Sequence, residues 1–277
     1  MKLTVLVDNN TIIDRYFLAE PGLSFLIEDD ETALLFDTGY SGIFLDNAQK
    51  MGLDLRNLDY LAFSHGHLDH TWGLDRLLKY YIELKIEKLP FKKPTLIAHP
   101  ETFTSVISED FDEFGSLLSK RKLEKHFKMQ LSKEPQKLSK KLTFLGEIPR
   151  KNSFESIATY GRKEGAKEDD YVVEDSALVY NSSEGLVIIT GCSHAGICNI
   201  IEYAKEVCEN DKVADIIGGL HLQNPPEKQI EGTLDYMKAL QPKTLWACHC
   251  TDLNSKIALS TVANLEEVGV GLSVVYD

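Results

Sequence analysis

The sequence has no long hydrophobic run, few cysteines and fewer basic than acidic residues. A membrane-spanning helix needs about 20 consecutive apolar residues, and no such stretch is present. The five cysteines all lie between Cys192 and Cys250, an odd number without the spacing of a disulfide framework, which indicates reduced thiols. The net charge of −13 argues against general nucleic-acid binding, because phosphate contacts need a basic surface. We therefore expect a cytoplasmic protein without nucleic-acid or membrane partners; its oligomeric state stays open.

The length of the chain predicts one large domain. A chain of 277 residues buries about three quarters of the surface of its unfolded form, which is enough for one core. Residues 1–7 read as a strand followed at once by Asp8, which is too short and wrongly flanked for a signal peptide. We expect a single domain over residues 1–277 without a signal peptide.

One segment differs from the acidic remainder. Residues 120–141 carry nine lysines or arginines against Glu124 and Glu134, a local excess of seven positive charges. They belong to a charge-rich stretch, at about 101–141, that is predicted to be a basic helical insertion. This segment is either a solvated surface face or a lid that attracts a small anionic substrate. Both alternatives predict exposed side chains.

Three histidines and an aspartate stand together directly after the apolar run at 58–63: His65, His67, Asp69 and His70. If that run is a buried strand, the period of two directs His65, His67 and Asp69 toward one side. A strand-to-helix turn can then bring His70 to the same place. Neutral imidazoles with one carboxylate are typical ligands of zinc and, less specifically, of manganese or iron. The cluster therefore predicts a metal site rather than a solvated turn.

The apolar pattern predicts strands followed by helices, with hairpins at the edges. Runs at 23–28 and 32–37, separated by Asp29, Asp30 and Glu31, indicate a hairpin. Further strands are predicted at 95–98, 142–145, 176–180, 186–190, 213–217, 243–247 and 272–276. Helices are predicted at 41–51, 71–88, 195–209 and 252–268, with helical sequence also at 101–133. This order implies two mixed sheets covered by helices.

The histidine cluster resembles the His-x-His-x-Asp-His signature of the metallo-β-lactamase superfamily. Further similar motifs follow in order: Phe-Asp-Thr-Gly at 36–39, Gly-Cys-Ser-His-Ala-Gly at 191–196, Gly-Gly-Leu-His-Leu at 218–222 and Cys-His-Cys-Thr at 248–251. They are similar to a subgroup described as metal-dependent hydrolases, whose archaeal members include a dihydropterin-forming enzyme of methanopterin biosynthesis. The resemblance spans about residues 3–252. It implies an α/β fold, a four-layer αββα sandwich of two mixed β-sheets flanked by helices.

The resemblance also implies a dinuclear centre. One cation would be held by His65, His67 and His194, and the second by Asp69, His70 and His249. Zinc is the expected metal, as one or two ions, with manganese or iron as alternatives. Strand alternation directs the thiols of Cys248 and Cys250 away from the imidazole between them, so His249 is preferred as the ligand.

Other residues have less direct roles. Many superfamily members bridge the cations with an aspartate at a position that here reads Gly191-Cys192. Three alternatives stay open at this position: Cys192 replaces the bridge, hydroxide alone forms it, or only one metal is bound tightly. Asp37 is expected either to accept hydrogen bonds from a ligand imidazole or nearby backbone, or to cap its turn. His221, after a predicted strand, is expected to contact the substrate, and His99 is a second candidate.

These expectations combine into a hydrolytic mechanism. Zinc lowers the pKa of bound water from about 15.7 to about 7 and so supplies hydroxide, which Asp69 would orient toward a small anionic ester or phosphoester. The flavodiiron branch of the superfamily has glutamate in place of His67, so this histidine favours hydrolysis over redox chemistry. The helix that begins near Ala195 offers an N-terminus for an anion. Two alternatives remain, a pterin or phosphoribosyl-type synthase and a non-catalytic metal sensor.

Overall fold

The computed structural model describes residues 1–29, 32–109 and 111–277, and the chain forms two compact units. Unit 1 contains Met1–Ser132, Gly161–Asp169 and Gly269–Tyr276. Unit 2 contains Lys133–Tyr160, Asp170–Val268 and Asp277. Each unit has its own large mixed sheet, so the two mixed sheets of the predicted α/β class are confirmed. Within the described ranges, no helix is both long and apolar enough to cross a membrane.

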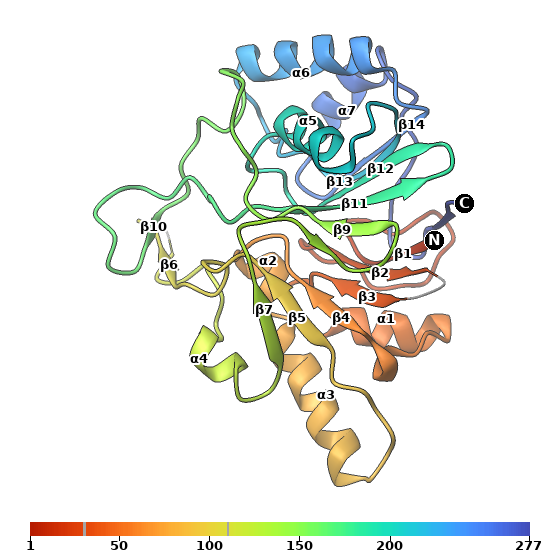
Figure 1. The fold of residues 1–277 in the computed structure, drawn as a ribbon, viewed down its shortest axis with the longest axis vertical. Coiled ribbons are helices and arrows are strands. Elements are labelled where there is room, and N and C mark those ends of the chain that lie inside the picture. The colour runs from red at the N-terminus through yellow and green to blue at the C-terminus, as the bar shows by residue number, and fades with distance from the viewer. Residues whose placement is uncertain (30–31, 110) are drawn as a thin grey trace. The chain divides into compact units, whose positions relative to one another are not determined.

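Unit 1 contains a seven-stranded sheet with the order β15-β1-β2-β3-β4-β5-β7 (Figure 1). Its strands are β1 (Lys2–Val7), β2 (Ser24–Glu28), β3 (Ala33–Phe36), β4 (Tyr60–Ala62), β5 (Thr95–Ala98), β7 (Lys128–Leu131) and β15 (Ser273–Val275). The antiparallel pair β2 and β3 confirms the predicted hairpin, although Asp30 and Glu31 of its turn lie outside the described residues. Strands β3, β4, β5 and β7 run parallel, so their carboxyl ends lie at the same edge of the sheet.

Two amphipathic helices cover one face of this sheet, α1 (Ile43–Met51) and α3 (Leu74–Ile86) (Figure 1). Helix α3 buries Leu74, Leu77, Tyr81 and Leu84, which recur at the spacing of one helix face, and they pack in one core cluster with residues of β1 to β5. The helix predicted over 41–51 is observed as α1 and ends at Gly52, whose φ of 74° gives a left-handed cap.

The helix predicted over 101–133 is wrong for most of that range. The chain instead forms β6 (Val106–Ile107), paired with β10 (Arg162–Lys163), then the one-turn helix α4 (Lys120–Leu123), and β7. In β7 exposed Lys128 and Gln130 alternate with half-buried Met129 and Leu131, a period of two. Pairing with β5 therefore overrides the helix preference of the lysine-rich sequence.

Unit 2 contains a six-stranded sheet with the order β14-β13-β12-β11-β9-β8 (Figure 1). Its strands are β8 (Gln136–Lys137), β9 (Leu142–Phe144), β11 (Ala177–Ser182), β12 (Gly185–Thr190), β13 (Val213–Gly219) and β14 (Thr244–Cys248). Strands β12, β13 and β14 are parallel neighbours, which brings their carboxyl ends to one edge.

The helices of unit 2 pack on one face of its sheet. They are α5 (Ile197–Cys208), α6 (Glu227–Leu240) and α7 (Leu253–Leu259) (Figure 1). Asp252 caps α7, because its carboxylate accepts a hydrogen bond from the backbone N–H of Ser255. The helix predicted over 252–268 is too long, since the chain leaves it after Leu259 and Leu265 pairs with Leu245 of the edge strand β14.

Candidate metal site

The four residues of the first cluster lie together in unit 1, just past the carboxyl end of β4. His65 and His67 follow the strand. His67 occupies the N-cap position of the short helix α2 (Leu68–Thr71) without a side-chain capping bond, and this helix carries Asp69 and His70. The ring of His65 lies 4.6 Å from that of His67 and 4.2 Å from that of His70, between centroids. All three imidazoles are buried, whereas the side chain of Asp69 is 25% exposed. The Oδ2 atom of Asp69 lies 3.7 Å from Nε2 of His70.

Asp37 organises this cluster from the end of the neighbouring strand β3. Its carboxylate is fully buried and accepts hydrogen bonds from the backbone N–H of Ser64 (2.8 Å) and the hydroxyl of Ser64 (2.7 Å). It also accepts a hydrogen bond of 2.7 Å from Nδ1 of His70. The Ser64 oxygen in turn lies 2.9 Å from Nδ1 of His65.

This network sets the tautomers of two imidazoles. A carboxylate only accepts hydrogen bonds, so the Ser64 hydroxyl donates to Asp37 and its oxygen accepts the Nδ1 proton of His65. His70 likewise holds its proton on Nδ1, toward Asp37. Both rings therefore keep Nε2 as the electron-pair donor. Such oriented imidazoles with an adjacent carboxylate fit a divalent cation in ligand type and in supporting hydrogen bonds.

The turn after β3 is held against the helix that carries His70. The N–H and the hydroxyl of Thr38 both donate to the His70 carbonyl oxygen, at 2.8 and 3.0 Å. Gly73 allows this approach, because a Cβ atom there would lie 2.1 Å from the Thr38 carbonyl oxygen. The Phe-Asp-Thr-Gly motif and the histidine motif thus form one unit of local structure.

Unit 2 gathers a second group at the carboxyl ends of its three parallel strands. The rings of His194 and His221 lie 4.1 Å apart, and the ring of Tyr160 lies 4.7 Å from His194 and 5.0 Å from His221. The Tyr160 hydroxyl is 3.4 Å from Nδ1 of His221. Burial first, and then the nearby Cys192 and Cys250, raise the pKa of Tyr160 to about 12, so its hydroxyl keeps its proton at neutral pH.

Two thiols belong to the same group. Potential ligand atoms of Cys192, His249 and Cys250 all lie within 4.8 Å of one another. The prediction that Cys250 points away from the imidazole of His249 is wrong, because His249 has a left-handed backbone (φ 51°) that ends the strand alternation. Burial acts to raise the pKa of Cys250, but a hydrogen bond with Cys192 and the imidazoles of His249 and His221 outweigh it and lower the pKa.

The N-terminus of α5 is occupied by the chain itself. The buried carboxylate of Glu155 accepts hydrogen bonds from the backbone N–H groups of Cys198 (2.9 Å) and Asn199 (3.2 Å). The expectation that this helix N-terminus, near Ala195, binds a substrate anion is therefore wrong. The N–H of Ala195 instead donates to Asp175, a fully buried carboxyl group whose pKa burial raises to about 7.

His99 is a buried residue of unit 1. It follows β5, is fully buried, and its Nδ1 accepts a hydrogen bond of 3.2 Å from the backbone N–H of Glu101. This contact gives His99 a structural role in its turn. Its predicted contact with substrate stays a prediction.

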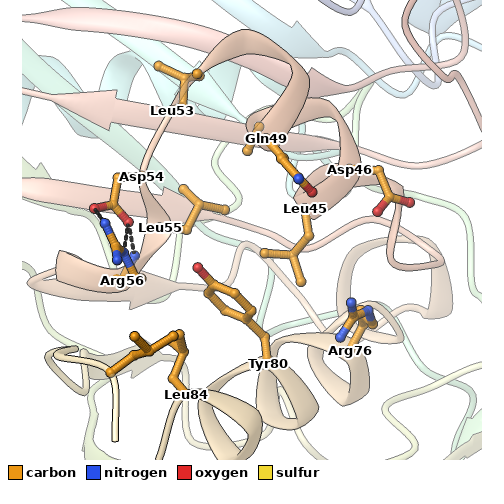
Figure 2. A pocket seen from close by; sticks show the side chains of 13 residues that line it. Leu45, Asp46, Gln49, Leu53, Asp54, Leu55, Arg56, Arg76, Tyr80 and Leu84 are labelled. Carbon is orange, nitrogen blue, oxygen red and sulfur yellow. Dashed lines mark hydrogen bonds and ion pairs between the residues drawn. The ribbon is translucent and has the colours of Figure 1, made fainter. Parts of the chain in front are cut away.

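A hollow elsewhere in unit 1, of about 520 Å³, lies between α1 and α3 (Figure 2). Figure 2 shows Leu45, Tyr80 and Leu84 around it, with Arg56 paired to Asp54 at 2.9 Å on its border. Among the described residues that line it, none belongs to the predicted metal site. It therefore contributes nothing to that site.

Comparison with known proteins decides the family. A family model described as the metallo-β-lactamase superfamily matches residues 18–207, more than half of the chain. The chain belongs to this superfamily. A solved structure described as Tm1679, a metal-dependent hydrolase of the β-lactamase superfamily, matches over the full length of both chains with 26% identity and a TM-score of 0.82. The predicted metallo-β-lactamase fold is thereby confirmed.

Two proteins of Methanocaldococcus jannaschii are similar along most of the chain. One is the 7,8-dihydropterin-6-methyl-4-(β-D-ribofuranosyl)-aminobenzene-5'-phosphate synthase, 30% identical over 276 residues, which cover 92% of this chain and 89% of the synthase. The other is the uncharacterized protein MJ0448, 31% identical over 277 residues, which cover 97% and 98% of the two chains. Members of the superfamily bind metal ions, and the clusters described above supply suitable donors.

Sequence patterns missed several residues of these clusters. Ser64 precedes the first histidine, so its position was a usable signal for a supporting hydrogen bond. Glu155 and Tyr160 lie in a charged loop with no periodic pattern, and no local signal indicates them. Their placement depends on contacts that form only in the folded unit.

Proposed function

We propose that this protein is a metal-dependent hydrolase that acts on a small anionic ester or phosphoester. The observation that carries the proposal is the network around Asp37, which holds two buried imidazoles with Nε2 as the donor atom. A purely structural histidine cluster does not need this orientation, whereas metal ligands commonly have it. The likeness to the metal-dependent hydrolase Tm1679 supports the same conclusion.

The predicted ligand sets are retained in the proposal. They are His65, His67 and His194 for one cation, and Asp69, His70 and His249 for a second. Zinc is the proposed metal, because imidazoles and carboxylates suit it. When bound, the cation supplies Lewis acidity and a nucleophile at neutral pH.

Residues of the chain then orient the reactants. Asp69, the partly exposed member of the first cluster, accepts a hydrogen bond from the attacking water and so fixes its direction. His221 contacts the substrate, and its hydrogen bond with Tyr160 holds the imidazole in place. Because Tyr160 stays protonated at neutral pH, its hydroxyl can donate to Nδ1 of His221 and leave a proton on Nε2 for a substrate oxygen.

The anionic character of the substrate in this proposal rests on the charge of the basic segment at 120–141, taken as a lid. All nine of its lysine and arginine residues are exposed, which agrees equally with a solvated surface face. The net charge of the whole chain is −13, so this segment is where an anion would meet positive potential.

The proposal is tested by stripping the protein with a chelator, restoring zinc, manganese or ferrous iron, and measuring hydrolysis of bis(p-nitrophenyl) phosphate and a p-nitrophenyl ester. Activity should depend on the restored metal. Removing an outer partner of a ligand typically lowers activity 10- to 100-fold. The activity of the His67→Ala variant should fall by more than this, while its circular dichroism spectrum stays native. Gln49→Ala, an exposed change on α1, is the control. Metal-loaded protein that hydrolyses neither reporter would contradict the proposal.

A synthase is the second candidate, because the 30% identity to the dihydropterin-type synthase covers 92% of this chain. A synthase should form a joined product only when a dihydropterin and a ribofuranosyl-aminobenzene phosphate are both supplied. A hydrolase should instead turn over single esters. A metal sensor with a saturated site should do neither.

A further inference from the structure

Cys192 and Cys250 come from different strands but meet at the carboxyl edge of the sheet in unit 2. Cys192 follows β12 and Cys250 follows β14, and the two strands flank β13. Their sulfur atoms and a ring nitrogen of His249 lie within 4.8 Å of one another. Two thiols and an imidazole at this spacing match the ligand types and the reach of a single zinc ion.

The strand between them leaves room for this meeting. Gly219 ends β13, and a Cβ atom on it would lie 2.6 Å from the Cys250 sulfur and 3.3 Å from Cα of Cys192. Any side chain at this position would clash with the Cys250 sulfur and with the Gly191 carbonyl oxygen, which would lie 2.5 Å away. The Cys250 sulfur therefore lies where the side chain of residue 219 would otherwise be.

Two backbone groups fix the position of one sulfur. The N–H of His221 donates a hydrogen bond of 3.2 Å to the sulfur of Cys250, and the thiol of Cys250 donates one of 3.3 Å to the carbonyl oxygen of Cys192, a proton that a bound cation would displace. Hydrogen bonds of this kind orient a thiolate ligand and tune its metal. Cys208, in contrast, is a half-buried cysteine at the end of α5 and belongs to none of these contacts among the described residues.

We propose that Cys192 and Cys250, together with His249, form a thiolate subsite that makes the protein select a thiophilic cation such as Zn²⁺ over Mn²⁺ or Mg²⁺. The inference rests on the proposed function in one respect, because His249 belongs to the predicted ligand set. Each thiol gives its proton to solvent as the cation binds, so two thiolates and a neutral imidazole balance the two positive charges.

Cobalt(II) tests the subsite, because sulfur ligation gives it an intense near-ultraviolet charge-transfer band that nitrogen and oxygen ligands do not give. After cobalt loading, wild-type protein and the matched control Cys208→Ser should show the band at full strength. Cys192→Ser and Cys250→Ser should each lose about half of it, and the double variant all of it. Zn²⁺ affinity should fall at least tenfold in either single variant, while Mn²⁺ affinity should stay within about threefold, since manganese prefers oxygen ligands.

A measurement on the unaltered chain keeps the inference testable if a variant fails to fold. Saturating Zn²⁺ should protect two of the five thiols from alkylation, and mass spectrometry should map them to Cys192 and Cys250. Cobalt that binds with visible bands but without the sulfur band would overturn the subsite and leave the proposed function intact. A disulfide between the two cysteines in freshly reduced, metal-loaded protein would also overturn it. Failure to bind any cation would overturn both proposals.

Discussion

Replacing Asp37 by asparagine should remove the hydrogen-bond acceptor of His70, while the side chain at position 37 keeps nearly the same size and shape. In this Asp37→Asn variant the amide oxygen can still accept from the Ser64 N–H, but the amide NH₂ group then faces the Nδ1 proton of His70. His70 must move its proton to Nε2, where it blocks coordination. The native carboxylate is fully buried, so water cannot replace the hydrogen bond that His70 loses in the variant.

The size of the effect follows from the bond that is lost. A hydrogen bond to a charged group contributes about 1.5–3 kcal/mol, which corresponds to about 10- to 150-fold in affinity at about 1.4 kcal/mol per tenfold. Removing an outer partner of a ligand typically lowers metal affinity 10- to 100-fold, which agrees. We expect Zn²⁺ affinity to fall in that range. The metal-free variant should also lose about 1–3 kcal/mol of unfolding free energy, because buried donors lose their acceptor.

Competition with a chromophoric chelator measures the affinity, urea unfolding measures the stability, and ¹⁵N chemical shifts of His70 report which nitrogen holds the proton. The matched control is Asp46→Asn, an exposed aspartate on α1, which should change none of the three. If Asp37→Asn bound Zn²⁺ within about twofold of the wild type, or kept the proton on Nδ1 of His70, the tautomer argument would be refuted.

Three further changes test other parts of the structure. Ser64→Ala removes the acceptor for the first histidine of the cluster and should lower Zn²⁺ affinity about fivefold, the equivalent of one hydrogen bond of about 1 kcal/mol; an unchanged affinity in the chelator assay would speak against that bond. Gly73→Ala places a Cβ 2.1 Å from a carbonyl oxygen and should cost about 1–3 kcal/mol of unfolding free energy in urea, whereas Gly52→Ala, with open space around it, should show only the backbone cost of a left-handed residue. Asp252→Ala removes the cap of α7 and should cost about 1 kcal/mol at neutral pH. Hydrogen bonds from the N–H groups of Asn224 and Ser255 hold the pKa of Asp252 below its ordinary value, so its contribution is present above the unfolded-state pKa and is lost as pH falls through the lower folded-state pKa. The difference between wild type and variant should therefore shrink below about pH 4, and a constant difference would contradict the capping role.

Much of the fold follows from local signals in the sequence. The apolar runs that became β2, β3, β12 and β13, and the glycine that ends α1, are short-range features that survive in the folded chain. The failures occur where pairing with a distant strand decides. Residues 128–131 are rich in helix-forming side chains, yet they add to the edge of a sheet whose other strands lie far away in sequence. Likewise, the segment after Leu259 pairs with β14 and ends α7 early.

The site residues themselves show why strand alternation predicts them only in part. Asp37, Ser193, His221 and His249 each have a left-handed backbone, with φ of 57°, 67°, 49° and 51°, and each stands just past the carboxyl end of a parallel strand or in the turn after it. Non-glycine residues adopt this conformation at a cost of about 1–2 kcal/mol each. Glycine would turn the chain at a lower cost, so the turn alone does not require these four side chains. The left-handed step reverses the direction that alternation assigns to the next side chain. At His249 it brings Cys250 to the imidazole, contrary to the period of two. Of the eleven non-glycine residues with positive φ in the described chain, these four stand at the strand ends that carry the candidate site, where strain persists because the geometry of the side chains matters more than local stability.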